Sequence, residues 1–168
     1  MATGFLHPGA MGASLAAACT GDRLWCSTGR SPATRARAEA AGLIDVGTLE
    51  ALVGGADTIV SVCPPTSAAA VADSVATLGF EGTYVDANAI APATTRAIGE
   101  RFARFVDGGV IGPPAKFPGT TRLYLSGADS SRIAELWTGS AVETRVVEGG
   151  VGAASAVKMC FAAWTKGT

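Results

Sequence analysis

Residues 4–12 read Gly-Phe-Leu-His-Pro-Gly-Ala-Met-Gly, and a run of mostly small residues, Ala-Ser-Leu-Ala-Ala-Ala, follows directly at positions 13–18. Apolar residues enter a turn that contains two glycines and leave it with a helical pattern. In α/β proteins this order of strand, turn and helix brings the N–H groups of a helix N-terminus to the pyrophosphate of a dinucleotide. The stretch therefore predicts a nucleotide-binding βαβ unit.

The glycine fingerprint of such turns is GxGxxG, and only its second and third glycines are present here. The second makes room for the pyrophosphate, and the third lets the helix pack closely on the strand. The nucleotide contacts expected from this turn are Gly9, Ala10, Met11 and Gly12. A merely tight turn is the alternative. His7 replaces the first glycine, and we expect it to be a partly exposed histidine, pointing outward or held at some conformational cost. A phosphate contact or a pH-sensing role is the alternative.

Beyond the turn, apolar β-type segments alternate with alanine-rich helical segments, which is typical of a mostly parallel sheet covered on both faces. Strands are expected at residues 3–6, 23–27, 43–46, 58–63, 83–86, 105–110, 122–126 and 143–147. Helices are expected at residues 10–19, 32–41, 48–53, 66–78, 92–102, 130–137 and 152–166. The predicted fold class is α/β, with a Rossmann-like, doubly wound sheet.

The composition indicates a packed apolar interior, since 48% of the 168 residues are hydrophobic and 16% are charged. The net charge of -1 provides no basic surface for nucleic acid or for a membrane. The N-terminus lacks a secretory signal pattern, and no run reaches the roughly 20 apolar residues of a membrane span. We therefore expect a cytoplasmic protein.

The four cysteines are scattered along the chain and form no CxxC pair. They are Cys19, Cys26, Cys63 and Cys160. The spacing excludes the common zinc and redox motifs, so we expect free buried thiols and no metal site.

The residues that select between NAD and NADP should follow the second strand, about twenty residues past the glycines. An NAD site needs an acidic residue there, but residues 27–31 read Ser-Thr-Gly-Arg-Ser. Arg30 can pair with a 2′-phosphate and stack on adenine, while the hydroxyls of Thr28 and Ser31 can donate to the same group. The segment therefore predicts NADP, with an ordinary solvated arginine as the alternative.

Four motifs, in this order, resemble the β-hydroxyacid dehydrogenase superfamily, which includes 6-phosphogluconate dehydrogenase, 3-hydroxyisobutyrate dehydrogenase and the imine reductases. They are Gly-Ala-Met-Gly at 9–12, Val-Asp-Ala-Asn-Ala-Ile-Ala-Pro at 85–92, Asp-Gly-Gly-Val-Ile-Gly-Pro-Pro at 107–114 and Gly-Ala-Ala-Ser-Ala-Val-Lys at 152–158. The resemblance implies a Rossmann domain that binds NADP, an interdomain helix, and an all-helical domain that forms dimers and closes the active site. On that basis, residues 1–148 are the NADP-binding domain. Residues 149–168 are the start of the interdomain helix of a truncated C-terminal domain.

The resemblance also assigns cofactor contacts beyond the glycine turn. Cys63, Pro64 and Pro65 belong to the loop that passes over the nicotinamide ribose in this family. Asn88 lies in the loop on the substrate side, where its amide can still hydrogen-bond to cofactor or substrate.

Two polar positions of the family are apolar in this chain. The usual substrate-binding serine falls on Ile111, so oxyanion contacts would come from the backbone amides of Gly108 and Gly109. The asparagine that often follows the catalytic lysine by one turn is Ala162. These departures favour a less polar or differently held substrate.

Lys158 matches the catalytic lysine of the family. Desolvation disfavours the charged form of a lysine on an apolar helix beside a cofactor, so we expect its pKa to fall into a range useful for proton transfer. It would take the hydroxyl proton during oxidation, or donate it during carbonyl reduction, while hydride moves between substrate and nicotinamide. The alternative is a lysine that only extends from a buried helix to solvent.

Together these expectations describe an NADP-dependent oxidoreductase, or an N-terminal fragment of one, that acts on a small hydroxy acid, alcohol or carbonyl compound. The alternatives are a catalytically silent NADP-binding module and an imine reductase-like enzyme. The apolar pattern of residues 152–166 lacks a partner within the chain. We expect a truncated chain, or a short form, and a homodimer through this helix or through the missing domain. Trp164 is expected to be a core position.

Overall fold

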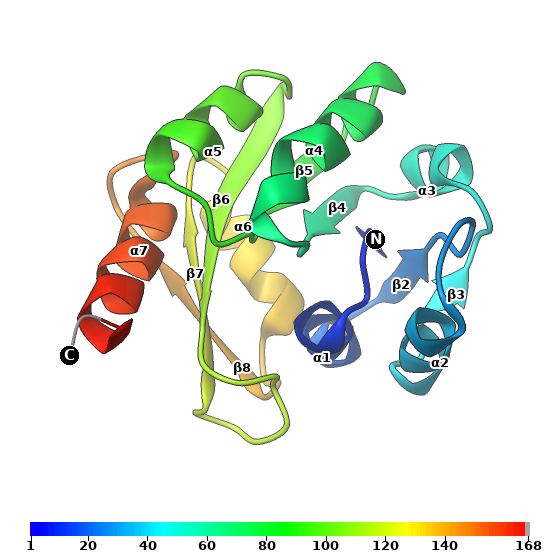
Figure 1. Ribbon diagram of the computed structural model, residues 1–168, viewed down its shortest axis with the longest axis horizontal. Coiled ribbons are helices and arrows are strands. Elements are labelled where there is room, and N and C mark those ends of the chain that lie inside the picture. Colours follow the sequence, from blue (N-terminus) through cyan, green and yellow to red (C-terminus); the bar gives the residue numbers. More distant parts are fainter. Residues whose placement is uncertain (167–168) are drawn as a thin grey trace.

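The computed structural model describes residues 1–166, which form one twisted sheet with helices on both faces (Figure 1). The strands are β1 (Ala2–Phe5), β2 (Asp22–Trp25), β3 (Ile44–Asp45), β4 (Thr58–Ser61), β5 (Thr83–Asp86), β6 (Arg104–Ile111), β7 (Thr121–Ser126) and β8 (Val142–Val146). The helices are α1 (Ala10–Ala18), α2 (Pro32–Ala40), α3 (Leu49–Gly55), α4 (Ala68–Thr77), α5 (Pro92–Gly99), α6 (Ser130–Ala134) and α7 (Ala153–Lys166), with 3₁₀ turns η1 (Pro65–Ser67) and η2 (Glu135–Trp137). The predicted α/β, Rossmann-like fold is confirmed, with element ends shifted by a few residues. Residues 167–168 of the predicted terminal segment lie outside the described residues.

The strand order is β3-β2-β1-β4-β5-β6-β7-β8, and all neighbours run parallel except β6 and β7. The order reverses between β1 and β4, which pair with Phe5 opposite Val60. Ligands of open α/β sheets bind in the crevice at the carboxyl ends of the strands where this reversal occurs. The topology therefore places the glycine turn after β1 beside the loop after β4.

Two apolar cores lie on opposite faces of the sheet. The core of one face lies under α1, α2 and α6 (Figure 1), and the indole Nε1 of Trp137 donates to the carbonyl oxygen of Leu15 at 2.8 Å. On the other face, under α3, α4 and α5, the rings of Tyr84 and Phe102 stack with centroids 4.2 Å apart. Both faces of the strands are therefore buried, which explains their continuous apolar character.

The N-terminus of α1 differs from those of α2 and α3. Side-chain oxygens cap the latter two, because Ser31 accepts from the backbone N–H of Thr34 and Thr48 accepts from that of Ala51, both at 3.2 Å. The N-cap of α1 is Gly9, which offers no side chain, and the first turn contains no acidic residue. The first N–H groups of α1 are therefore available to an anion.

Burial decreases along α7. Ala154 and Ser155 are fully buried near its start, whereas Phe161 is 44% exposed and Trp164 is 81% exposed. The prediction of a core position for Trp164 is wrong, because the helix packs on the sheet through its first turns. Cys160 is also exposed, unlike the buried Cys19 and Cys26, although all four cysteines are free as expected. Within the described chain, no helix is both long and apolar enough to cross a membrane.

Candidate functional site

Two cavities lie at the carboxyl ends of the strands, and the glycine turn contributes a residue to each. The first, the arginine cavity, has a volume of about 160 Å³, and its walls include Leu6, His7, Arg30, Leu49, Val71 and Val75. The second, the lysine cavity, has a volume of about 170 Å³, and its walls include Met11, Cys63, Pro65, Asn88, Val110 and Lys158. The turn thus lies between two hollows at the strand reversal, where a dinucleotide needs a place for each of its halves.

The two glycines of the turn have different surroundings. A Cβ at Gly12 would lie 2.6 Å from the carbonyl oxygen of His7, so only glycine lets α1 approach the turn this closely. A Cβ at Gly9 would have no atom within 4 Å. The space in front of Gly9 is therefore open beside the N-terminus of α1, where a pyrophosphate would bind.

His7 adopts the turn without a left-handed backbone, because no non-glycine residue of the described chain has a positive φ. The conformational cost expected of a histidine here is avoided. Its side chain is half-buried as expected, but it lines the arginine cavity instead of pointing outward. Burial, assisted by the positive charge of Arg30, lowers the pKa of His7 to about 4. The imidazole is therefore neutral near pH 7.

Arg30 is half-buried and lines the same cavity, which argues against an ordinary solvated arginine. Its Nε and the Nδ1 of His7 are both buried, and neither has a hydrogen-bond partner. Buried polar atoms are nearly always hydrogen-bonded in proteins, and each exception needs an explanation. Other buried side-chain atoms of the described residues also lack partners, among them the Nε of Arg23 and the Oδ2 of Asp86, but His7 and Arg30 line one cavity, which favours a ligand between them.

Thr28 and Ser31 lie outside the cavity and are exposed. The Oγ1 of Thr28 donates to the carbonyl oxygen of Gly47 at 2.8 Å, and Ser31 caps α2. Of the three residues predicted to contact the 2′-phosphate, only Arg30 therefore lines the cavity. The hydroxyls of Thr28 and Ser31 form hydrogen bonds with the backbone outside it.

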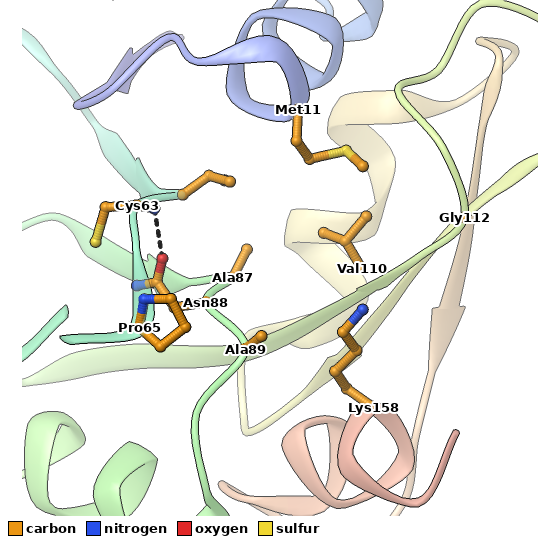
Figure 2. A pocket seen from close by; sticks show the side chains of 10 residues that line it. Met11, Cys63, Pro65, Ala87, Asn88, Ala89, Val110, Gly112 and Lys158 are labelled. Atoms are coloured by element: carbon orange, nitrogen blue, oxygen red, sulfur yellow. Dashed lines mark hydrogen bonds between the residues drawn. The ribbon is translucent and has the colours of Figure 1, made fainter. Parts of the chain in front are cut away.

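A buried carboxylate fixes the helix that carries Lys158. The Oδ2 of Asp107 accepts from the backbone N–H groups of Gly152 at 3.0 Å and Ser155 at 2.9 Å, and from the Oγ of Ser126 at 3.1 Å. Its Oδ1 accepts from the Oγ of Ser155 at 2.6 Å. Asp107 is fully buried and serves the otherwise unpaired N–H groups at the start of α7. One turn later, Lys158 extends toward Val110 and the cavity (Figure 2).

Gly108 and Gly109, whose amides are predicted to make oxyanion contacts, belong to β6. They lie in mid-strand, buried, opposite Leu125 and Tyr124 of β7, and neither lines the lysine cavity. A Cβ at Gly108 would lie 3.2 Å from Ala87, and one at Gly109 would lie 2.7 Å from the carbonyl oxygen of Ala154. Their position explains close packing of α7 and β5 on β6, and it gives no support to the oxyanion contacts expected from their amides.

Asn88 lines the lysine cavity, but protein groups already use both ends of its amide. Its Oδ1 accepts from the backbone N–H of Cys63 at 2.6 Å (Figure 2), and its Nδ2 donates to the Oγ of Ser61 at 3.1 Å. Asn88 therefore ties the loop after β4 to the loop after β5. Both prolines of the loop after β4 are exposed, and Pro65 lines the cavity whereas Pro64 does not. Burial raises the pKa of the Cys63 thiol, which disfavours a reactive thiolate.

The sequence-based prediction overlooked the buried aspartates beneath this cavity. Asp86 and Asp107 end up side by side in register on β5 and β6. Burial, with a further contribution from the charge of Asp107, raises the pKa of Asp86 to about 6. The available signal was an aspartate within each of two predicted adjacent strands, at the end of residues 83–86 and inside residues 105–110.

No protein-family model matches the sequence, and no curated protein matches it. Among solved structures, one similar to this chain is a conserved protein of unknown function with reported similarity to 3-hydroxyacid dehydrogenases. It has 27% sequence identity and a TM-score of 0.87, over 99% of this chain and 65% of that one. The 3-hydroxyisobutyrate dehydrogenase of Mycobacterium tuberculosis, solved with L-serine, has 19% identity and a TM-score of 0.76, over 95% of this chain and 58% of that one.

A reductive aminase from Aspergillus terreus, solved with NADPH4, cyclohexanone and allyl amine, has 17% identity and a TM-score of 0.80, over 98% of this chain and 61% of that one. The neighbours of this chain are 3-hydroxyacid dehydrogenase-like proteins and imine reductases. The resemblance seen in the sequence predicted these relatives. The chain spans about three fifths of the length of the dehydrogenase and reductase structures that it matches.

Proposed function

We propose that this chain binds NADP(H) across the two cavities, as the nucleotide-binding part of an oxidoreductase. The reaction is hydride transfer between NADP(H) and a small hydroxy acid, alcohol or carbonyl compound. The observation that carries the proposal is the arrangement around the turn. The uncapped N-terminus of α1 lies between one cavity lined by Arg30 and another lined by Lys158.

The arrangement suits the two halves of the dinucleotide. The open space at Gly9 and the free N–H groups of α1 suit the pyrophosphate. Arg30 suits the 2′-phosphate of the adenosine ribose, with Thr28 and Ser31 at the edge of that end. The loop of Cys63, Pro64 and Pro65, together with Asn88, suits the nicotinamide ribose. The reductive aminase was solved with an NADPH-type cofactor and a neighbouring imine reductase with NAD⁺, which supports a nucleotide in this crevice.

Lys158 is the residue of the lysine cavity that we assign to proton transfer. When bound, the nicotinamide supplies or accepts the hydride. During oxidation the Nζ of Lys158 takes the hydroxyl proton of the substrate, and during reduction it returns a proton to the carbonyl oxygen. The Asp107 bonds hold the start of α7 on the sheet and so keep this amine in place.

The test is titration of NADPH and NADH into the protein, followed by turnover with a panel of ketones, aldehydes, hydroxy acids and cyclic imines. We expect NADPH to bind more tightly than NADH. Tight binding of NADPH with no turnover on the whole panel would favour a catalytically silent NADP-binding module. Turnover confined to imines would favour the imine reductase-like alternative, and binding of neither dinucleotide would refute the proposal.

The role of Lys158 is tested by Lys158→Met, which keeps a long side chain and removes the amine. We expect turnover to fall by about 100-fold or more, because positioned proton transfer contributes roughly that factor. NADPH affinity should stay unchanged. The matched control is Lys116→Met, in the exposed loop before β7. Equal turnover in the two variants would remove Lys158 from the mechanism.

A homodimer through α7, or through a helical domain that packs on it, is part of the same proposal. Phe161 and Trp164 are exposed on this helix, and exposed apolar patches commonly mark interaction surfaces. Sedimentation equilibrium of the protein and of Trp164→Glu tests this association. A monomer in both cases would contradict dimerisation through α7.

A further inference from the structure

We propose that His7 is a specificity-determining residue that acts with Arg30 on the 2′-phosphorylated ribose of adenosine. This inference rests on the proposed function, because it places the adenosine end of the dinucleotide in the arginine cavity. It gives a role to the residue that replaces the first glycine of the fingerprint.

The topology brings the two side chains together from neighbouring strands. His7 follows β1 and Arg30 follows β2, and these strands pair with Gly4 opposite Leu24. Both residues line the same cavity, and the charge of Arg30 is close enough to lower the pKa of His7. The Nδ1 of His7 and the Nε of Arg30 are buried without partners. Each of these two cavity-lining residues therefore has one buried nitrogen for which the described part of the protein supplies no hydrogen-bond partner.

The other described residues of the cavity favour an anionic ligand. Leu49, Val71 and Val75 give it apolar walls, and Ser74 is polar but uncharged. No acidic side chain is among the described residues that line it. A cation in apolar surroundings attracts an anion more strongly than it does in water. The cavity is therefore suited to a phosphate bound by Arg30.

His7 contributes a hydrogen bond and no charge of its own. As a neutral imidazole it can place a proton on Nδ1 and donate to a phosphate oxygen. A hydrogen bond to an ionised acceptor is about twice as strong as one between neutral groups. The same donor therefore favours a ribose with a 2′-phosphate over one with a 2′-hydroxyl.

The test uses adenosine 2′,5′-bisphosphate and AMP, which carry the adenosine end alone and do not depend on the lysine cavity. We expect the protein to bind the bisphosphate more tightly than AMP. His7→Ala should reduce this preference by roughly tenfold, the factor that one charge-assisted hydrogen bond gives. His7→Asn, which keeps a neutral donor, should retain most of it. Arg30→Ala should reduce this preference further. Arg145→Ala, at the exposed end of β8, should leave it unchanged.

A second measurement needs no variant. The sequence contains a single histidine, so imidazole ¹⁵N signals in NMR spectra report His7 alone. We expect saturating bisphosphate to shift the Nδ1 signal strongly and AMP to shift it little. A bound bisphosphate that leaves this signal in place would overturn the inference, even if Arg30→Ala weakens binding.

The two proposals fail in distinguishable ways. If NADPH binds and His7→Ala leaves the bisphosphate preference unchanged, the role of His7 is wrong and the proposed function stands. If neither NADPH nor NADH binds, the proposed function fails, and the inference about His7 fails with it.

Discussion

The lysine cavity and the arginine cavity differ in how their polar groups are held. Beneath the first, Asp107 accepts four hydrogen bonds, and Asn88 joins Ser61 to Cys63. In the second, His7 and Arg30 each keep a buried nitrogen without a partner. Beneath the lysine cavity only the Oδ2 of Asp86, among these described groups, lacks a partner. The difference suggests that hydrogen bonds of the fold position most of the lysine cavity in advance, whereas the arginine cavity is completed by what binds there. Substitutions should therefore separate stability from affinity.

The largest expected effect is on stability, in Asp107→Ala. It leaves the N–H groups of Gly152 and Ser155 and two buried hydroxyls without their acceptor. We expect the free energy of unfolding to fall by about 3 kcal/mol or more, because each abandoned buried donor costs about 1–3 kcal/mol. Urea unfolding measures the change. If the alanine variant does not fold, the same measurement is made on Asp107→Asn.

The control for this substitution is Asp73→Ala, which removes the surface ion pair with Arg101. Exposed pairs contribute about 0–1 kcal/mol, so little change is expected. Equal losses in Asp73→Ala and in an Asp107 variant would show that the buried network does not hold the lysine cavity.

Substitutions at the two glycines of the turn should have effects of intermediate size. Gly12→Ala forces a Cβ against the carbonyl oxygen of His7 and should destabilise the fold by about 2 kcal/mol. Gly9→Ala points a methyl group into open space, so it should leave stability nearly unchanged and weaken NADPH binding. Thermal unfolding and NADPH titration of both variants check this separation. The assignment of the pyrophosphate to Gly9 is wrong if Gly9→Ala binds NADPH normally.

Near each cavity, one group has its pKa shifted to a value between about 4 and 6, and the two groups affect stability in opposite directions. The pKa of His7 falls to about 4 on folding, so its contribution to stability is lost as the pH decreases from 6.5. The pKa of Asp86 rises from 3.8 to about 6, so its contribution is lost as the pH increases through that window. In the native protein the two effects oppose each other between about pH 4 and pH 6.

Single substitutions should reveal the two slopes. In Asp86→Asn, only His7 of these two groups still titrates. The free energy of unfolding should then rise with pH across this window by roughly 1–2 kcal/mol, a value reduced for the partial exposure of His7. In His7→Asn, only Asp86 of these two groups still titrates. The free energy of unfolding should then fall by about 2–3 kcal/mol as the pH increases across the window. Urea unfolding at a series of pH values gives both curves. Parallel curves for the two variants would contradict the assigned pKa shifts.

The smallest expected effect concerns the edge of the arginine cavity. Ser31→Ala removes the cap of α2 and should cost about 1 kcal/mol of stability. If Ser31 also contacts the 2′-phosphate, NADPH binding should weaken more than NADH binding. Equal affinities before and after the substitution would restrict Ser31 to its capping role.

Much of the fold could be predicted from the sequence, because local signals agree with it. Proline and an N-cap serine mark the start of α2, and the apolar run before Pro64-Pro65 marks β4. The order of the motifs also predicted which loops meet at the crevice. Such signals depend only on residues that are close in the sequence, so they can be recognised before the fold is known.

Long-range bonds in the site could not be predicted in this way. Asp107 finds Ser155 across 48 positions, and Asn88 finds Cys63 across 25. Nothing near His7 in the sequence indicates that its side chain enters a cavity with Arg30, because that meeting depends on the pairing of β1 with β2. The close packing of α7 on Gly109 could not be predicted either, because a sequence does not show which helix will cross a strand.

The contact at Gly109 has a consequence for motion. Because a Cβ there would lie only 2.7 Å from the carbonyl oxygen of Ala154, the main chain of α7 lies almost directly on the main chain of β6. Side-chain contacts between helix and sheet relax by changing rotamers, and a backbone contact has no such freedom. The base of Lys158 should therefore fluctuate with the sheet itself, and the reach of its amine should vary only through the torsions of its own side chain.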